Sequence, residues 1–156
     1  MKYIVLSQNY SAIVDDEDYE YLNQWKWCYS YGYAVRTICK KGKQTQIRMH
    51  RVILNPPKDK HIDHINRNRL DNRKENLRIC NTAENSRNQI GNFRLRKYSK
   101  YKGVKKNANC KTWSARINFN KKCIYLGSFK TEKEAAKAYN AAAIIYFGKF
   151  ARLNEL

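Results

Sequence analysis

Positive charge rises along this chain, and its distribution limits how the chain can fold. Residues 1–47 carry six basic residues against five acids, residues 48–90 carry ten against five, and residues 91–156 carry sixteen against three. The total is a net charge of +19. Such an excess opposes compaction unless a polyanion neutralises it. The distribution therefore predicts a distinct, strongly basic C-terminal part that faces nucleic acid.

The remaining composition indicates a folded protein of the cytoplasm. Hydrophobic residues make up 42% of the chain and aromatic residues 13%, which is too rich for a disordered basic tail. No stretch approaches the ~20 apolar residues of a membrane span, and the first ten residues lack a signal-peptide pattern. The five cysteines form no C-x-x-C pair, so we expect reduced thiols and no zinc ribbon. We expect neither a membrane partner nor a small-molecule cofactor.

Residues 1–47 have the pattern of a small sheet with one short helix. Asp15 or Asp16 can cap a helix that starts near Glu17. The segments rich in aromatic and β-branched residues predict strands at Tyr3–Leu6, Trp27–Ser30 and Tyr33–Ile38. The aromatic residues between Trp25 and Tyr33 either stack on bases or form the core. The core is the stronger interpretation, since a small domain must bury large side chains.

All three histidines, His50, His61 and His64, fall within fifteen residues. Apolar residues on either side of an Asn, Arg and Asp-rich stretch predict two short strands joined by a long loop. A helix capped by Asn81 or Thr82 should follow. This order, strand, loop, strand and helix, would bring the polar side chains of the segment to one site.

The residues of that site suit phosphodiester hydrolysis. Asp63 and the Asn85 carbonyl offer oxygen ligands to a hard divalent cation. His64 can take a proton from water near neutral pH. The helix N-terminus and the arginines would attract a phosphate. Because neighbouring strand residues point to opposite faces, Asp63 and His64 can converge only if the strand twists or ends there.

Residues 48–88 resemble the HNH nuclease motif of phage and intron-encoded homing endonucleases, whose fold is called ββα-metal. The matching string is Asp63-His64, then Asn76 in Glu75-Asn76-Leu77-Arg78, then Asn85 in Glu84-Asn85. The resemblance implies that His64 is the general base, that Asp63 and Asn85 ligate Mg²⁺ or Mn²⁺, and that Asn76 braces the loop through backbone hydrogen bonds.

Other polar residues lie in and beside this string. His50 and Arg51 occupy a basic segment before the motif and could contact a phosphate or the site. His61 is expected in a loop, and Asn68 and Asn72 are expected in turns. The family often has glycine after Asp-His-Ile-Asn, whereas this chain has Arg67. We expect the departure to change the loop only locally.

Residues 101–156 have a pattern of three strands and a helix. Trp113–Phe119 alternates polar and apolar residues, and Thr131 with Glu134 forms a capping box for a helix that runs to about Phe147, with Gly148 just beyond it. On that helix we expect one buried face. Its expected members are Ala135, Ala138, Tyr139, Ala142 and Ile145.

The same segment resembles the plant Apetala/ethylene-response-factor DNA-binding domain, which also occurs in phage homing endonucleases. The matching pieces are Tyr101-Lys102-Gly103-Val104, Trp113-Ser114-Ala115-Arg116-Ile117, Leu126-Gly127-Ser128-Phe129 and Glu134–Asn140, closed by Ala151-Arg152-Leu153-Asn154. The resemblance implies that the sheet lies in the major groove of duplex DNA. The expected reading face is Lys102, Lys105, Arg116, Asn118 and Tyr125, whereas Trp113 and Tyr139 belong to the core.

Between the two parts, residues 91–100 are expected to form a basic linker. Its cationic side chains would track phosphates, or would simply be solvated in a connector. They are Arg94, Arg96, Lys97 and Lys100.

Together these patterns predict an α+β protein, with a ββα-metal nuclease half and a three-stranded antiparallel sheet packed on one helix. The expected divisions are 1–47, 48–90, 91–100 and 101–156. The function expected is a metal-dependent endonuclease that cuts double-stranded DNA, with a homing role, in the host cytoplasm if a phage encodes it. The alternatives are a DNA-binding regulator with an inactive nuclease scaffold and, from charge alone, an RNA-binding protein.

Overall fold

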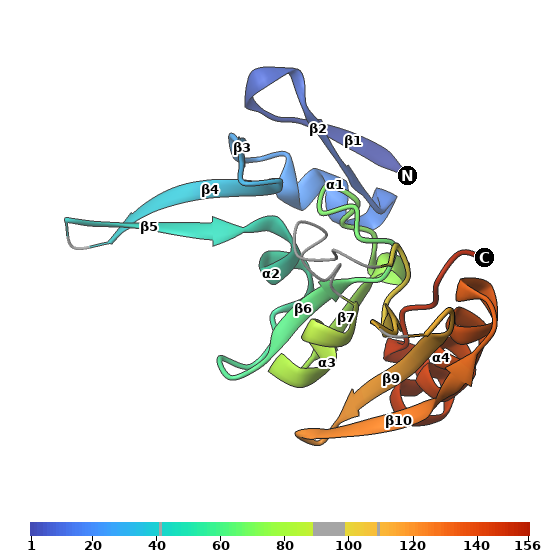
Figure 1. Ribbon diagram of the computed structural model, residues 1–156. Helices are drawn as coiled ribbons and strands as arrows, with labels where there is room; N and C mark the ends of the chain where they lie inside the picture. Colours follow the sequence, from blue (N-terminus) through green and yellow to red (C-terminus); the bar gives the residue numbers. More distant parts are fainter. Residues whose placement is uncertain (41, 89–98, 109) are drawn as a thin grey trace. The chain divides into compact units, whose positions relative to one another are not determined.

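A computed structural model describes residues 1–40, 42–88, 99–108 and 110–156 (Figure 1). The chain divides into two compact units, Met1–Asn85 and Ser86–Leu156, with the boundary inside one helix. Most of the expected linker, including Arg94, Arg96 and Lys97, lies outside the described residues.

The described residues of unit 1 form three small antiparallel sheets and two short α-helices, and a third helix crosses the boundary to unit 2. Strands β1 (Lys2–Val5) and β2 (Ser11–Val14) pair with each other, as do β6 (His61–His64) and β7 (Leu77–Cys80). The third sheet has the order β3 (Cys28–Ser30), β4 (Tyr33–Lys40) and β5 (Lys43–Arg48). The helices are α1 (Asp16–Leu22), α2 (Met49–Leu54) and α3 (Thr82–Asn88), with 3₁₀ turns at Ser7–Asn9 and Lys74–Asn76.

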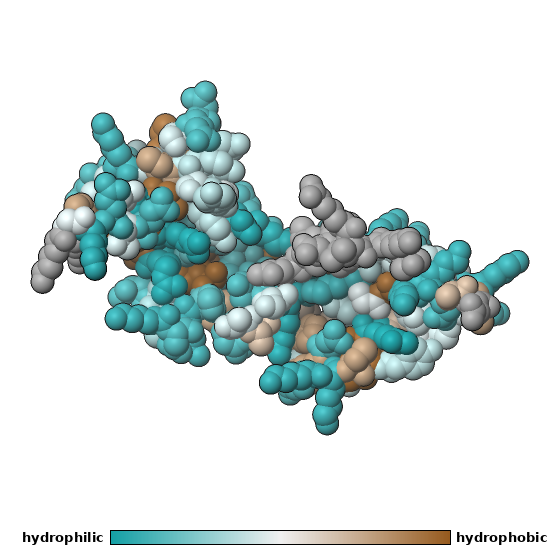
Figure 2. Space-filling view, turned by 60° about the vertical axis from the view of Figure 1, so that its left-hand side comes forward, coloured by the Kyte–Doolittle hydropathy of each residue, from teal (hydrophilic) through white to brown (hydrophobic). Residues whose placement is uncertain are grey.

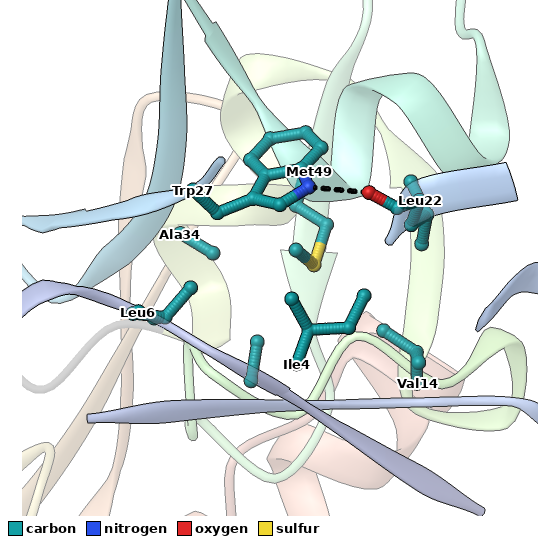
Figure 3. Close-up of a cluster of buried hydrophobic side chains, with 8 residues drawn as sticks. Ile4, Leu6, Val14, Leu22, Trp27, Ala34 and Met49 are labelled. Carbon is teal, nitrogen blue, oxygen red and sulfur yellow. Dashed lines mark hydrogen bonds between the residues drawn. The ribbon is translucent and has the colours of Figure 1, made fainter. Parts of the chain in front are cut away.

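The core of unit 1 lies where β1, β2, α1 and α2 meet. Leu22 and Met49 are completely buried, and the Trp27 indole donates a hydrogen bond of 2.8 Å to the Leu22 carbonyl (Figure 3). Of the aromatic run, Trp27 is buried and Trp25 and Tyr29 pack partly against this core, which confirms the core interpretation for them. Tyr31 and Tyr33 are exceptions: Tyr31 is 92% exposed at the turn between β3 and β4, and the half-buried Tyr33 is not part of this core cluster.

Strands β4 and β5 form a long ribbon that extends beyond the rest of unit 1 (Figure 1). Only the part nearest the core is buried, and the residues of β5 before Ile47 are exposed. The chain then enters α2 directly after Arg48. Neither β5 nor α2 was expected from the sequence. In β5 the mixed Lys, Gln and Thr residues show no clear apolar alternation, which is the pattern that predicts a strand.

Unit 2 has the expected three-stranded antiparallel sheet backed by one helix, which confirms the fold class. The strand order is β10 (Lys122–Phe129), β9 (Trp113–Phe119) and β8 (Val104–Lys106), and α4 (Glu132–Phe147) packs across one face. Ile117, Tyr139 and Phe147 form the core with small alanines of α4. Gly103 has φ +76°, and a Cβ there would lie 2.0 Å from the Tyr139 ring, so only glycine fits.

Helix α4 has the capping box that its sequence predicted. The Thr131 hydroxyl accepts from the Glu134 amide at 3.2 Å, and the Glu134 carboxylate accepts from the Thr131 amide. A 3₁₀ turn, Gly148–Phe150, follows the helix.

One expectation for the α4 face was wrong. Ile145 is 79% exposed, whereas Ala136, Ala143 and Phe147 are buried. Each residue turns the helix by about 100°, which places Ile145 about 80° from Ala135 in the direction away from Ala136, Ala143 and Phe147.

Polar side chains cover most of the surface seen in Figure 2, with apolar residues in small patches. None of the described helices is long and apolar enough to cross a membrane.

Candidate active site and DNA-binding face

The histidine-rich segment folds as a hairpin, β6–β7, followed by α3. Strand β6 ends at His64, the point where the sequence required it to twist or end. Asp63 pairs with Arg78 along the ladder and His64 pairs with Leu77. Both Asp63 and His64 are buried, so neither is an ordinary exposed strand residue.

The Asp63 carboxylate forms a buried ion pair with Arg78. Arg78 donates to Oδ2 of Asp63 from Nε at 2.9 Å and from Nη2 at 2.6 Å. Both printed bonds end on the same carboxylate oxygen. A cation at Asp63 would therefore share this carboxylate with Arg78.

His64 is held as a neutral imidazole in a fixed orientation. Burial lowers the pKa of His64 below its usual 6.5, although Asn72 and Asp63 oppose that shift. The Oδ1 atom of Asn72 lies 3.5 Å from Nε2 of His64. Because Nδ2 of Asn72 donates to the Leu70 carbonyl at 3.1 Å, the amide presents its oxygen to His64. This arrangement favours the Nε2–H tautomer, in which the lone pair is on Nδ1.

Asn72 is the residue that sequence reasoning undervalued. It was expected as a turn former, but its side chain is 1% exposed and contacts His64. Its backbone amide also donates to the Ile13 carbonyl at 2.8 Å, which fixes it beside β2. Its place in Asp71-Asn72-Arg73, within the motif, was the available signal.

The loop between β6 and β7 is closed by its own polar side chains. Asn76 accepts from the Asn66 amide at 2.9 Å through Oδ1 and donates to the Asp71 carbonyl at 2.7 Å through Nδ2. Asp71 accepts from Nε and Nη2 of Arg73, and these bonds lower the pKa of the Asp71 carboxyl. Asn76 thus makes the backbone contacts expected of a residue that braces the loop.

Arg67 lies in this loop with φ 68°, in the left-handed region. Its amide donates to the His64 carbonyl at 2.9 Å, so the turn begins directly after the imidazole. Glycine adopts this conformation without a Cβ penalty. The backbone therefore explains why the resembling family often has glycine here.

Residues 1–47 anchor the loop. Asp15 accepts from the Lys74 amide at 2.7 Å, and the Lys74 amine forms ion pairs with Glu17 and Asp18. Ile13 exchanges backbone hydrogen bonds with Leu70 and Asn72. The acidic residues Asp15, Glu17 and Asp18 thus bind the loop between β6 and β7 through Lys74. Sequence spacing could not reveal this contact, because the partners lie far apart along the chain.

His50 and Arg51 lie on α2 beside the site. The His50 ring is 5.1 Å from the His64 ring, and burial, followed by His64 and two arginines, lowers the pKa of His50 to about 3. A neutral His50 can contact a phosphate only as a hydrogen-bond donor. Arg51 donates to the carbonyls of Lys60 and Pro57. His61 was expected in a loop but begins β6, where its ring contacts the Thr82 hydroxyl at 3.3 Å.

Asn85 lies in α3, which starts at Thr82 after the Asn81 cap. Its side chain is half-buried, and in the described part of the chain its carboxamide makes no hydrogen bond. Among the described residues no three His, Cys, Asp or Glu side chains gather as a metal site. A cation here would thus depend on the Asp63 carboxylate and the Asn85 carbonyl, a hard oxygen donor set that suits Mg²⁺ or Mn²⁺.

The face of the unit 2 sheet opposite α4 carries most of the residues expected to read DNA. Arg116 and Asn118 are exposed on β9, and Tyr125, directly across from Arg116, is 57% exposed. The Arg116 guanidinium lies 5.7 Å from the Tyr125 ring. Lys105 is exposed on β8, whereas the Lys102 amine donates to the Arg87 carbonyl at 2.5 Å.

The core expectations for this unit hold in part. Tyr139 is buried, as expected, and Trp113 is half-buried at the start of β9. Ser114, on the same side of β9 as Arg116, is nonetheless buried, and its hydroxyl donates to the Lys105 carbonyl at 3.2 Å.

Comparisons with known proteins agree with this geometry. Residues 55–87 match the family of HNH endonucleases. An uncharacterized HNH endonuclease of Acanthamoeba polyphaga mimivirus is 33% identical over 100 residues, which cover 64% of this chain and 50% of that protein.

Plant transcription factors form the second group of relatives. An AP2-like ethylene-responsive transcription factor of Arabidopsis thaliana is 38% identical over 89 residues, 47% of this chain and 26% of the relative. An APETALA2-like protein of Oryza sativa is 48% identical over 58 residues, 36% of this chain and 13% of the relative. The chain thus spans half or less of the length of each of these relatives.

Proposed function

We propose that this chain, which combines an HNH endonuclease domain with an AP2/ERF-like domain, is a metal-dependent DNA endonuclease. The observation that carries the proposal is the state of His64: buried, neutral at pH 7, beside Asp63, and held by Asn72 at one ring nitrogen. A neutral imidazole with one oriented nitrogen is the form that a general base requires.

In the proposed reaction His64 takes a proton from water, and the water oxygen forms a bond to phosphorus while the bond from phosphorus to the 3′ oxygen breaks. The proton goes to Nδ1 of His64, and the 3′ oxygen takes a proton from solvent. Asn72 keeps Nε2 protonated and so orients the imidazole. Asn76 holds the loop that carries these groups, because it bonds the backbone at residues 66 and 71.

Asp63 and Asn85 would hold a divalent cation, which, when bound, neutralises the charge that develops on the leaving oxygen. The HNH family is in general metal-dependent. The half-buried Asn85 carboxamide, which makes no hydrogen bond in the described residues, fits this role.

The AP2/ERF-like domain would choose the cleavage site. Arg116, Asn118 and Tyr125 lie exposed on the sheet face that α4 leaves uncovered, and Lys105 is exposed beside them. Arginine can make bidentate contacts with guanine in the major groove. A homing role for a mobile element is the biological setting that the combination of the two domains supports.

A second candidate function is a sequence-specific DNA-binding regulator whose nuclease part is a scaffold. The Asp63–Arg78 ion pair favours it, since a cation must share a carboxylate that already has a buried partner.

Incubation of the full chain with supercoiled DNA, in Mg²⁺ and in EDTA, separates the two functions. The endonuclease gives nicked or linear DNA in Mg²⁺ only. The regulator binds the DNA in both conditions and leaves it intact.

A further inference from the structure

Two arginines of unit 1 stack on one tyrosine beside the candidate active site. The guanidinium carbons of Arg48 and Arg69 each lie 4.7 Å from the centre of the Tyr33 ring. That ring is 6.1 Å from the His64 ring and 5.4 Å from the His50 ring. The Tyr33 ring therefore has both cations and the proposed general base as neighbours.

Three separate segments build this cluster, so it is a product of the fold. Tyr33 begins β4 and Arg48 ends β5, one residue before α2. Arg69 comes from the loop between β6 and β7, and its Nη1 donates to the Tyr31 carbonyl at 3.2 Å. Tyr33, Arg48 and Arg69 thus bring together the ribbon β4–β5 and the loop that follows His64.

The charges of the cluster are not balanced by acids. Both arginines are exposed, and in the described part of the chain neither forms an ion pair with a carboxylate. Both guanidinium groups therefore keep a net positive charge beside the Tyr33 ring, and that charge would attract an anion that approaches this surface.

We propose that Arg48 and Arg69, supported by Tyr33, form a clamp that binds a phosphodiester of the DNA strand next to the bond that His64 attacks. The inference rests on the proposed nuclease function. Arginine suits it because its fixed fork of five N–H donors matches phosphate oxygens, and Arg69 uses only one of these donors on Tyr31. The contact carries no sequence information, so the clamp positions the strand while unit 2 selects the site.

The test is DNA binding in EDTA by the full chain and by Arg48→Gln and Arg69→Gln, as a function of salt. Each phosphate contact contributes about 0.9 to the slope of log K against log salt. We expect each variant to lower that slope by about one unit, for all duplex sequences alike. The matched control is Lys26→Gln, which removes one exposed positive charge of the same unit. Lys26 contacts neither Tyr33 nor the histidines. We expect the salt slope to change less in this variant than in Arg48→Gln or Arg69→Gln.

Tyr33 provides a second set of variants. Tyr33→Leu removes the ring and should reduce the slope as the arginine variants do, whereas Tyr33→Phe keeps the ring and should bind as the parent. If the glutamine variants fail to fold, Arg48→Lys and Arg69→Lys replace them, because lysine keeps the positive charge but lacks the fork of donors. We expect these variants to keep the salt slope of the parent while KM for cleavage rises.

These readouts separate the clamp from the nuclease function. If the parent never cuts DNA, but Arg48→Gln and Arg69→Gln each lower the salt slope of DNA binding by about one unit, the nuclease function is contradicted and a phosphate clamp is supported. A chain that cuts DNA while both variants match Lys26→Gln in slope, affinity and KM overturns the clamp.

Discussion

Asp63 and Arg78 face each other across the β6–β7 ladder and form a buried ion pair, with Nη2 of Arg78 2.6 Å from Oδ2 of Asp63. The guanidinium thus neutralises the carboxylate that the HNH string designates as a metal ligand. Removal of one partner of a buried pair leaves the other charge uncompensated, which costs about 3–5 kcal/mol.

Arg78→Gln should therefore destabilise unit 1 by about 3 kcal/mol in EDTA. Mg²⁺ should recover more stability in this variant than in the parent, because a cation on Asp63 replaces the lost positive charge. Urea unfolding with and without Mg²⁺ measures both effects. Equal Mg²⁺ stabilisation of parent and variant would show that the cation does not bind at Asp63.

Asn72→Ala should disturb His64 without removing it. Loss of the Asn72 oxygen leaves Nε2 of His64 without that acceptor, so the imidazole should shift from the Nε2–H tautomer toward a mixture. Nitrogen-15 NMR of the histidine rings reports the tautomer directly, and we expect kcat to fall about 10-fold with KM little changed. An unchanged tautomer in the variant would mean that Asn72 does not orient the base.

Arg67→Gly should stabilise the loop. The left-handed conformation at φ 68° costs a residue with a Cβ roughly 1–2 kcal/mol, part of which the greater freedom of glycine in the unfolded chain offsets. A net gain of about 0.5–1 kcal/mol in the free energy of unfolding is expected. Arg67→Ala is the matched control, since it removes the same charge but keeps the Cβ; if both variants have equal stability, backbone strain is not the cause of any change.

Arg116→Ala should relax sequence preference, because Arg116 is exposed on the open sheet face across from Tyr125. A bidentate contact with a base is worth ~1–3 kcal/mol of discrimination. The comparison is Lys100→Ala in the connector, which should weaken binding to all sequences about equally. Selection from random duplexes decides between them: an unchanged consensus with uniformly weaker binding would assign Arg116 to phosphate contact.

Much of the site could be predicted from the sequence because its residues are close along the chain. Asp63, His64 and Asn76 belong to one hairpin and its loop, so their spacing almost determines their arrangement. The Asn72 contact and the Asp15–Lys74 bond depend on how β2 and α1 pack against the loop, which no local pattern encodes. The cluster of Tyr33, Arg48 and Arg69 was missed for the same reason, since these residues meet only in the folded chain.

The fold shows the same division. The capping box at Thr131 and the alternation of β9 are local signals, and both were confirmed. Strand β5 was missed because its exposed ribbon needs no apolar alternation. Ile145 was misplaced because it lies outside the face of α4 that Ala136, Ala143 and Phe147 bury. Local patterns thus predict elements, whereas burial depends on the partner against which each element packs.

The most direct test of the central claim is cleavage of target DNA in Mg²⁺ by the parent and by His64→Ala, with DNA affinity measured in parallel. Loss of a general base typically costs ~10²–10⁴-fold in rate. We predict a loss in that range with unchanged affinity, because His64 is buried and unit 2 carries the expected reading face. Cleavage by His64→Ala at the rate of the parent would contradict the proposed mechanism.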